Sequence, residues 1–187
     1  MQGRFIWLVW FSAVIVVTAL YDAGNVHATS PEGFTSTTVA RGTLNSIEVS
    51  NYFAPLKSDA SLSLQETQES SDLYVQNNIW QPGGSTGWHS HPGHSLIIVT
   101  AGAVTDYEGH DSNCKPHVYT KGMGFVDPGG DHIHVIRNEG AVQARAIAVQ
   151  IIPTGKHRRI DAPDPGNCRF RRRRQCARND FIRTPRA

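Results

Sequence analysis

The chain of 187 residues is long enough for one domain and short for two. Its formal net charge is only +2, yet residues 156–187 hold eleven Lys or Arg and three Asp, whereas residues 29–155 hold six basic and twelve acidic residues. The aromatic content of 9% and the lack of any nucleic-acid-binding motif argue against a specific nucleic acid as the partner.

Residues 1–28 are predicted to be a secretory signal peptide. An early Arg4 precedes an apolar run from Phe5 to Leu20, and Val26-His27-Ala28 fits a small-x-small cleavage site. The apolar run is shorter than the roughly 20 residues that span a bilayer, which favours a signal peptide over the alternative of an uncleaved membrane anchor. We therefore expect an exported protein, periplasmic or extracellular.

The chain that follows is predicted to be all-β. Residues 29–71 comprise a polar arm, a first strand within 42–51 and a Ser-rich loop or short exposed helix from residue 56 onward. Residues 72–155 hold short runs rich in Val, Ile, Thr and Tyr between turn residues, a pattern typical of strands. These runs cover 73–80, 88–91, 95–102, 103–109, 117–130, 132–140 and 141–153. About eight strands and no convincing helix predict a sandwich, jelly roll or barrel.

Residues 156–187 are predicted to be a basic, disordered tail. The segment ends in "RFRRRRQCARNDFIRTPRA", which has no apolar periodicity and reads as a charged extension. A solvated tail is the favoured interpretation, and weak contact with an anionic surface is the alternative.

The three cysteines are Cys114, Cys168 and Cys176. An exported chain permits a disulfide, and an odd count leaves one thiol over. Cys114 and Cys168 both lie in loop contexts rich in turn residues, which favours a Cys114–Cys168 bridge, with Cys168–Cys176 as the alternative. The chain has no CxxC, so a thiolate zinc site or a redox motif is not expected.

Histidines gather in two places at matching spacing. His89 and His91 are two residues apart, which on a strand puts both side chains on one face, and His132 and His134 repeat the pattern. Two such strands facing one barrel interior converge on one point, and neutral imidazole suits several transition metals. The remaining histidines of the domain are predicted to lie at the surface or to be hydrogen-bonded: His110, His117 and His157.

The segment "GWHSHPGHSLIIVTAG" resembles the first motif of the cupins, and "GMGFVDPGGDHIHVIRN" resembles the second. The two motifs lie 19 residues apart, from Gly102 to Gly122, which is close to the usual gap. The resemblance implies a single-domain jelly-roll β-barrel. It also implies one divalent transition metal ion, Fe, Mn, Zn or Ni, held by His89, His91 and His134.

The chain departs from the cupin pattern at two points. The family glutamate should lie at Ser95 or Leu96, and neither is acidic, which makes the neighbouring His94 a candidate fourth ligand. The interval from Gly130 to His134 is one residue longer than usual, so His132 is an alternative to His134.

The resemblance implies an exported metal-dependent enzyme acting on a small molecule, dioxygenase-, isomerase- or lyase-like. The alternative is a non-catalytic cupin that captures a small anionic or sugar-like ligand, and a barrel without metal is a third interpretation. Trp88 is a candidate for the pocket mouth, and Arg137 either meets an anionic ligand or pairs with Asp127 or Asp131. A homodimer is expected by resemblance only. No Ser-His-Asp, Cys-His or paired-carboxylate arrangement is evident.

Overall fold

The computed structural model describes residues 28–46 and 69–170, and all regular structure in these ranges is β. The strands are β1 (Glu32–Leu44), β2 (Ser71–Ser85), β3 (His89–Ser90), β4 (Ser95–Ala101), β5 (Ala103–Glu108), β6 (His117–Thr120), β7 (Gly124–Asp127), β8 (His134–Arg137), β9 (Ala144–Pro153) and β10 (Ile160–Asp161). These ranges contain no helix that is long and apolar enough to cross a membrane. The predicted signal peptide, most of the Ser-rich loop and residues 171–187 lie outside the described residues.

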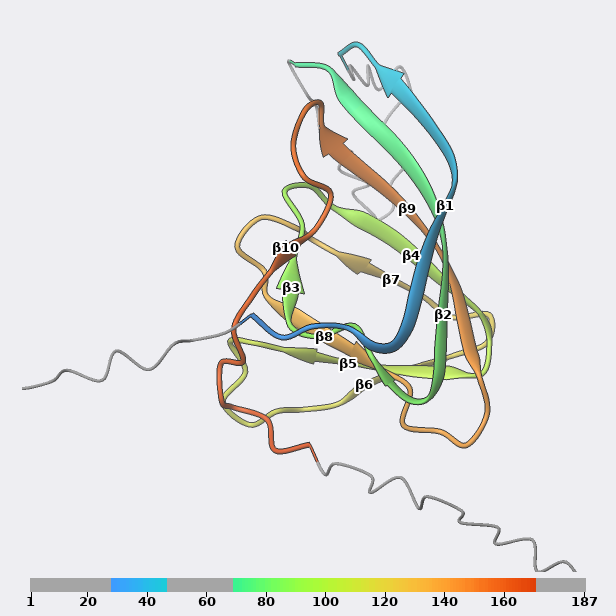
Figure 1. Ribbon diagram of the computed structural model, residues 1–187, viewed down its shortest axis with the longest axis vertical. Coiled ribbons are helices and arrows are strands. Elements are labelled where there is room, and N and C mark those ends of the chain that lie inside the picture. Colours follow the sequence, from blue (N-terminus) through green and yellow to red (C-terminus); the bar gives the residue numbers. More distant parts are fainter. Residues whose placement is uncertain (1–27, 47–68, 171–187) are drawn as a thin grey trace, which may run out of the picture.

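The ten strands form one antiparallel sheet that curls into a nearly closed barrel with two halves. One half has the order β1-β2-β9-β4-β7 and the other β10-β3-β8-β5-β6. The pair Ser85–Arg137 joins β2 to β8 and so links the two halves. Figure 1 shows β1, β2 and β9 as long strands that extend beyond the shorter strands β3, β5, β6 and β8. The all-β jelly-roll prediction is confirmed.

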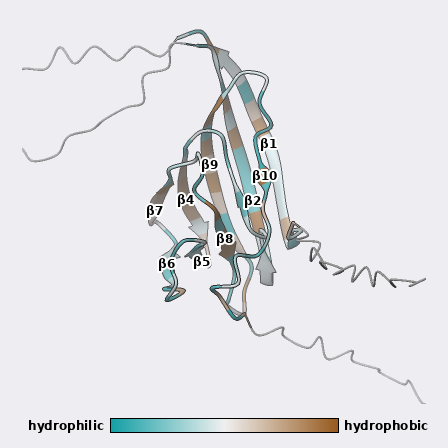
Figure 2. Cartoon of the chain, turned by 90° about the vertical axis from the view of Figure 1, so that its left-hand side faces the viewer, coloured by the Kyte–Doolittle hydropathy of each residue, from teal (hydrophilic) through white to brown (hydrophobic). Residues whose placement is uncertain are grey.

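Alternation along the strands places the main core inside the barrel. In β4 the buried residues Ser95, Ile97 and Val99 alternate with the exposed Leu96 and Ile98, because successive side chains of a strand point to opposite faces. The core contains Trp80, Ile97, Val99, Val104, Ile136, Ala144, Ala146 and Ala148, with Phe34, Tyr119 and Phe125 against it. Figure 2 shows hydrophobic residues concentrated on β4, β7, β8 and β9.

A second apolar cluster lies on the other face of β8. It contains Trp88, Tyr107, Val135, Ala162 and Cys168, with Cys114, Ile133 and Phe170 partly buried against it. The disulfide joins Cys114 to Cys168, as predicted, with the two Cα atoms 5.2 Å apart. Part of the segment predicted as a tail therefore packs on the barrel: β10 pairs with β3, and the packing extends to Phe170.

The first two strands are longer than the sequence pattern predicts. β1 begins at Glu32, inside the segment predicted to be an arm, and β2 continues through the predicted Pro-Gly-Gly turn to Ser85. The two strands pair from Leu44–Ser71 to Phe34–Trp80, residues 81–84 bulge out of the register, and pairing resumes at Glu32–Ser85. A Cβ on Gly84 would lie 2.5 Å from the carbonyl oxygen of Gly33. Glycine is therefore required at position 84 for this close approach rather than for a turn.

Candidate metal centre

Three histidines meet inside the barrel. His89 and His91 come from β3 and the residue after it, and His134 begins β8, where its Cα is the cross-strand partner of His89. All three are buried, and one ring nitrogen from each lies within 4.8 Å of the others. The spacing His-x-His on one strand, with a third histidine from the neighbouring strand, thus produces the convergence that the sequence predicts.

Hydrogen bonds orient all three rings in the same way. Nδ1 of His89 is 2.9 Å from the carbonyl oxygen of Gly87, and Nδ1 of His91 is 2.5 Å from that of Arg158. Nδ1 of His134 is 3.1 Å from Oδ1 of Asp106. The nearest partner of each Nδ1 is an acceptor, although the Gln150 amide nitrogen also lies 3.4 Å from Nδ1 of His91. Each Nδ1 therefore donates to its nearest partner, and the lone pair is left on Nε2. Metal-binding histidines are held in this manner in proteins.

The three histidines line a small cavity, of about 50 Å³. Nε2 of His134 is fully buried and makes no hydrogen bond within the described part of the chain. A buried polar atom without a partner is costly unless something binds it. Three neutral imidazoles directed at one point therefore fit a divalent transition metal ion such as Zn, Fe, Mn or Ni.

A carboxylate lies beside these three histidines, and it forms a separate group of potential ligands with His132 and His134. Asp127, at the end of β7, is the direct cross-strand partner of Ser95 on β4. Its Oδ2 lies 3.7 Å from Nε2 of His91 and 3.7 Å from Nε2 of His134. The chain thus places a carboxylate across the strand from the position where the cupin glutamate was expected.

Burial and neighbouring charges shift the pKa values of the three histidines in different directions. Burial is the main reason that the pKa of His89 lies well below its usual value, and burial lowers the pKa of His91 to about 4. Burial also opposes the charged form of His134, but the hydrogen bond and negative charge of Asp106, together with Asp127, outweigh it and raise its pKa. His89 and His91 are therefore neutral at physiological pH, which is the form that binds metal, and His134 lies in a negative field that favours a cation.

Asp127 is held in its ionised form. Burial opposes ionisation, but the hydrogen bond with His132, the positive potential of His134 and His91, and the backbone N–H of Gly129 together lower the pKa of Asp127. The Gly129 N–H donates to Oδ1 at 3.0 Å, which leaves Oδ2 directed at the histidines. A charged oxygen is thus presented to the cavity.

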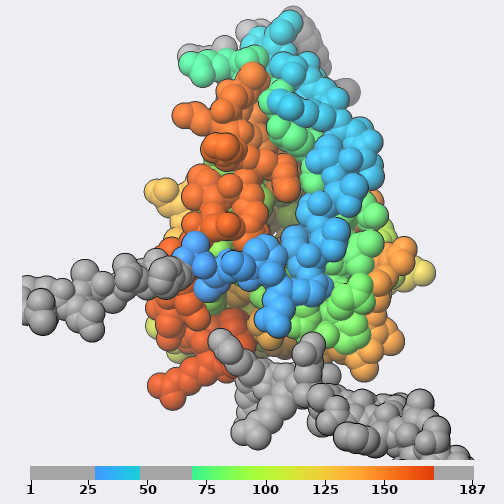
Figure 3. Space-filling view, viewed as in Figure 1, coloured from blue at the N-terminus to red at the C-terminus, as the bar shows by residue number. Residues whose placement is uncertain are grey.

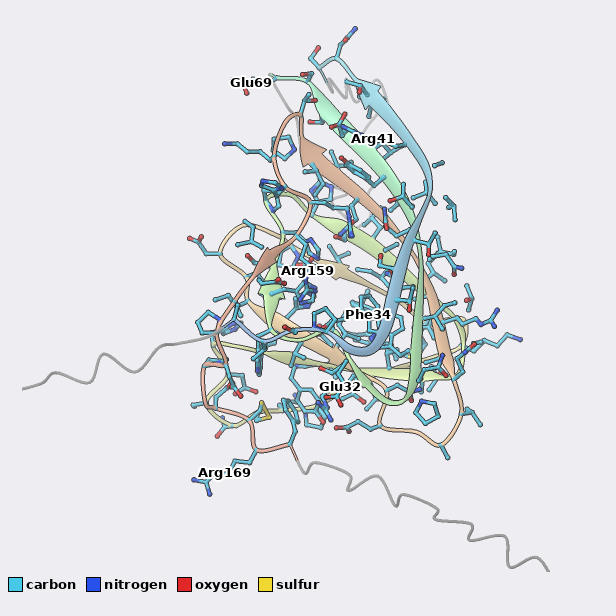
Figure 4. The ribbon with its side chains drawn as sticks, in the orientation of Figure 1. Glu32, Phe34, Arg41, Glu69, Arg159 and Arg169 are labelled. Carbon is cyan, nitrogen blue, oxygen red and sulfur yellow. A yellow bond between two sulfur atoms is a disulfide. The ribbon has the colours of Figure 1, made fainter. Side chains whose placement is uncertain are left out.

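Two arginines line the same cavity from the segment between β9 and β10. Arg158 donates from Nη1 to Oε1 of Gln150 at 2.8 Å, and Arg159 donates from Nη2 to the carbonyl oxygen of Thr86 at 2.7 Å. Burial lowers the pKa of both guanidinium groups. Arg159 pairs with Asp161, but no described carboxylate lies within ion-pair distance of Arg158. Figure 4 shows Arg159 and Phe34 in the middle of the barrel, and in Figure 3 β1 runs in blue beside the orange residues of β9 and the following segment.

The other predicted ligands lie elsewhere. His94 is half-buried and belongs to none of the groups of described residues that are able to hold a metal. His132 does not join His89 and His91, because its ring contacts Asp127 and Glu108 instead. The preference for His134 over His132 therefore agrees with the geometry.

The two predicted pocket residues do not line the cavity. Trp88 and Arg137 lie one position away from cavity-lining residues of β3 and β8, so their side chains point to the opposite face of the sheet. Trp88 packs in the second apolar cluster, and the Arg137 guanidinium lies 4.2 Å from the ring centroid of Phe170. Arg137 pairs with Glu139 at 3.6 Å rather than with Asp127 or Asp131.

Comparison with known proteins agrees with this architecture. Residues 79–150 match the family model described as the cupin domain. The chain therefore contains a cupin domain, as the two sequence motifs predict. No curated protein matches the sequence.

Several solved structures are similar to part of the chain. An oxalate oxidase structure is 22% identical, with a TM-score of 0.41, and the match covers 48% of this chain and 46% of that one. The polyketide cyclase RemF from Streptomyces resistomycificus is 19% identical, with a TM-score of 0.41 and coverage of 50% and 64%. A cupin domain from Bordetella pertussis is 21% identical, with a TM-score of 0.37 and coverage of 42% and 80%. The chain spans about half the length of the oxalate oxidase structure.

Proposed function

We propose that the protein is an exported, metal-dependent cupin enzyme that acts on a small anionic molecule. His89, His91 and His134 would hold one divalent transition metal ion, with Asp127 as the fourth ligand. The observation that carries the proposal is the convergence of three buried histidine rings: one nitrogen of each lies within 4.8 Å of the others, and the nearest partner of each Nδ1 is a hydrogen-bond acceptor. When bound, the ion would supply Lewis-acid or redox chemistry at an open coordination position.

Arg158 supports an anionic substrate. It is a half-buried cation whose one side-chain hydrogen-bond partner among the described residues is the neutral Gln150, and it lines the cavity that the histidines face. Burial of a cation without a counter-ion is unfavourable, and a carboxylate or similar anion in the cavity would relieve this cost. The cavity of about 50 Å³ favours a compact molecule of a few heavy atoms.

Export is proposed on two grounds. The first 28 residues have the pattern of a secretory signal peptide, and the Cys114–Cys168 disulfide is of the kind that persists in oxidising compartments. Detection of the protein, lacking its first residues, in the medium or the periplasm of expressing cells tests this part. Recovery of the full-length chain from the cytoplasm would contradict it.

The enzyme proposal is tested with short-chain mono- and dicarboxylates. Metal-free protein is loaded with iron, manganese or zinc, and oxygen uptake and product formation are followed for each compound. We expect turnover of at least one carboxylate by the wild type and a strongly raised KM in Arg158→Gln. Arg145→Gln, on the outer side of β9, is the matched control and should behave as the wild type. Binding of a carboxylate without turnover in any metal form would favour a non-catalytic binding protein instead.

A further inference from the structure

A second group of potential ligands lies outside the cavity, near the protein surface. Glu108 ends β5, His110 follows in the adjoining turn, and His132 precedes β8. One ligand atom from each lies within 4.8 Å of the others, and none of the three lines the cavity of the first site. We infer that Glu108, His110 and His132 form a second metal site, which takes a zinc ion from solvent.

A contact with Asp127 fixes the orientation of the His132 ring. Its Nδ1 is 3.3 Å from Oδ1 of Asp127, the oxygen that also accepts the N–H of Gly129 at 3.0 Å. Since this carboxylate oxygen accepts, Nδ1 donates, and the lone pair of His132 is left on Nε2. A carboxylate behind an imidazole is the common second-layer arrangement of zinc-binding histidines.

Two acceptor atoms then face each other. Nε2 of His132 is in contact with Oε2 of Glu108, and this oxygen is buried and makes no hydrogen bond within the described residues. A lone pair and a carboxylate oxygen repel unless a proton or a metal cation lies between them. The position favours a cation, because the Asp127 carboxylate lies on one side of the His132 ring and the Glu108 carboxylate on the other.

His110 supplies a third ligand atom, which a metal ion at this position needs and a bridging proton does not. Its Nδ1 lies 4.0 Å from the same Glu108 oxygen, and its side chain is 75% exposed and therefore able to rotate onto an ion. A proton needs only two partners, whereas two imidazoles and one carboxylate around one point are a zinc ligand set with one position left for water. The exposure of His110 also gives the ion a route from solvent.

The loop that carries His110 is held in place. Nδ2 of Asn167 donates to the carbonyl oxygens of Glu108, at 2.8 Å, and Asp111, at 2.7 Å. The next residue, Cys168, is bonded to Cys114 in the same loop region. The backbone of the loop is thus held in place before the ion arrives, and only the His110 side chain has to rotate, which lowers the entropic cost of binding.

The test is a zinc titration of tag-free, metal-depleted protein by isothermal calorimetry. We expect two zinc ions per chain for the wild type and one for His110→Ala and for Glu108→Gln, with the affinity of the remaining site unchanged. His157→Ala removes an exposed histidine that belongs to neither site, and it should still bind two. Because His110 is mostly exposed, His110→Ala should keep the wild-type circular dichroism spectrum.

The outcome separates this site from the cavity site. His89→Ala should lose the cavity ion and keep the zinc ion at Glu108, so failure of either site is visible independently of the other. Equal zinc stoichiometry and affinities in the wild type, His110→Ala and Glu108→Gln would overturn the second site and would mean that a proton bridges His132 and Glu108.

Discussion

Asp127 and Ser95 are direct cross-strand partners on β7 and β4, and the Asp127 carboxylate reaches the cavity on which the three histidines converge. Side chains of directly opposite residues on adjacent antiparallel strands begin only about 5 Å apart. The carboxylate of Asp127 therefore reaches nearly the same point in the barrel as a carboxylate at position 95 would. The serine of the first motif thus lies opposite an acid of the second motif.

Replacement of this acid should weaken the cavity site. We expect Asp127→Asn to lower the affinity for the cavity metal by about ten- to a hundredfold, because a charged ligand is lost while the side-chain shape is kept. The double variant Ser95→Glu with Asp127→Ser, which returns the acid to β4, should recover most of the affinity. Competition with a coloured chelator measures both, and Asp131→Asn, an exposed neighbour, is the control. Equal affinities of Asp127→Asn and the wild type would remove Asp127 from the ligand set.

Asp106 should act on the metal through His134 without touching it. Its Oδ1 accepts the Nδ1–H of His134 at 3.1 Å and so keeps Nε2 free for the ion. We expect Asp106→Asn to lower metal affinity by about tenfold or more, because the amide holds the ring less strongly. His134→Ala combined with Asp106→Asn should be no worse than His134→Ala alone, since the effect runs through His134. Additive losses in the double variant would show that Asp106 acts by another route.

The sequence predicts the elements that depend on local pattern. The His-x-His spacing and the turn residues of the two motifs place β3, β8 and their histidines correctly, because strand alternation is a local property. Asp127 was not recognised, because its role depends on the register between β4 and β7, which no local pattern reveals. Arg158 and Arg159 were assigned to a basic tail for a related reason: only the pairing of β10 with β3 brings their segment back over the cavity.

Trp88 and Arg137 are expected at the pocket from the sequence but lie outside it. Each neighbours a cavity-lining residue in sequence, yet neither lines the cavity. The alternation that turns His89 and Ile136 inward turns Trp88 and Arg137 outward, onto the cluster around Phe170.

The disulfide should stabilise the domain. Cys114 and Cys168 are 54 residues apart, and cross-linking a loop of this length is worth about 4 kcal/mol in the chain-entropy account. We expect the Cys114→Ser, Cys168→Ser double variant to show a clearly lower free energy of unfolding in urea, with an unchanged far-UV spectrum at low denaturant. A free energy of unfolding equal to that of the wild type would show that the apolar cluster holds residues 162–170 without the bridge.

Acid should weaken the pairing of β1 with β2. Asp72 on β2 is buried and accepts hydrogen bonds from Thr43 Oγ1 and Arg41 Nη2 on β1, both at 2.7 Å, and these lower its pKa. A carboxyl whose pKa is depressed on folding stabilises the fold above its unfolded pKa, about 3.9, and loses this contribution as the pH falls further. The wild type should therefore be more stable than Asp72→Asn at pH 7, and the difference should shrink by pH 3. A constant difference in urea midpoint across this range would refute the assignment.

The metal content of the cavity tests the account most directly. Tag-free His110→Ala protein, in which the proposed surface site is disabled, is purified without added metal and analysed by inductively coupled plasma mass spectrometry beside His110→Ala combined with His89→Ala. We predict close to one transition metal ion per chain in the first protein and close to none in the second, with both folded. Equal metal content in the two proteins, or none in either after growth with iron, manganese, zinc and nickel, would contradict a metal centre at His89, His91 and His134.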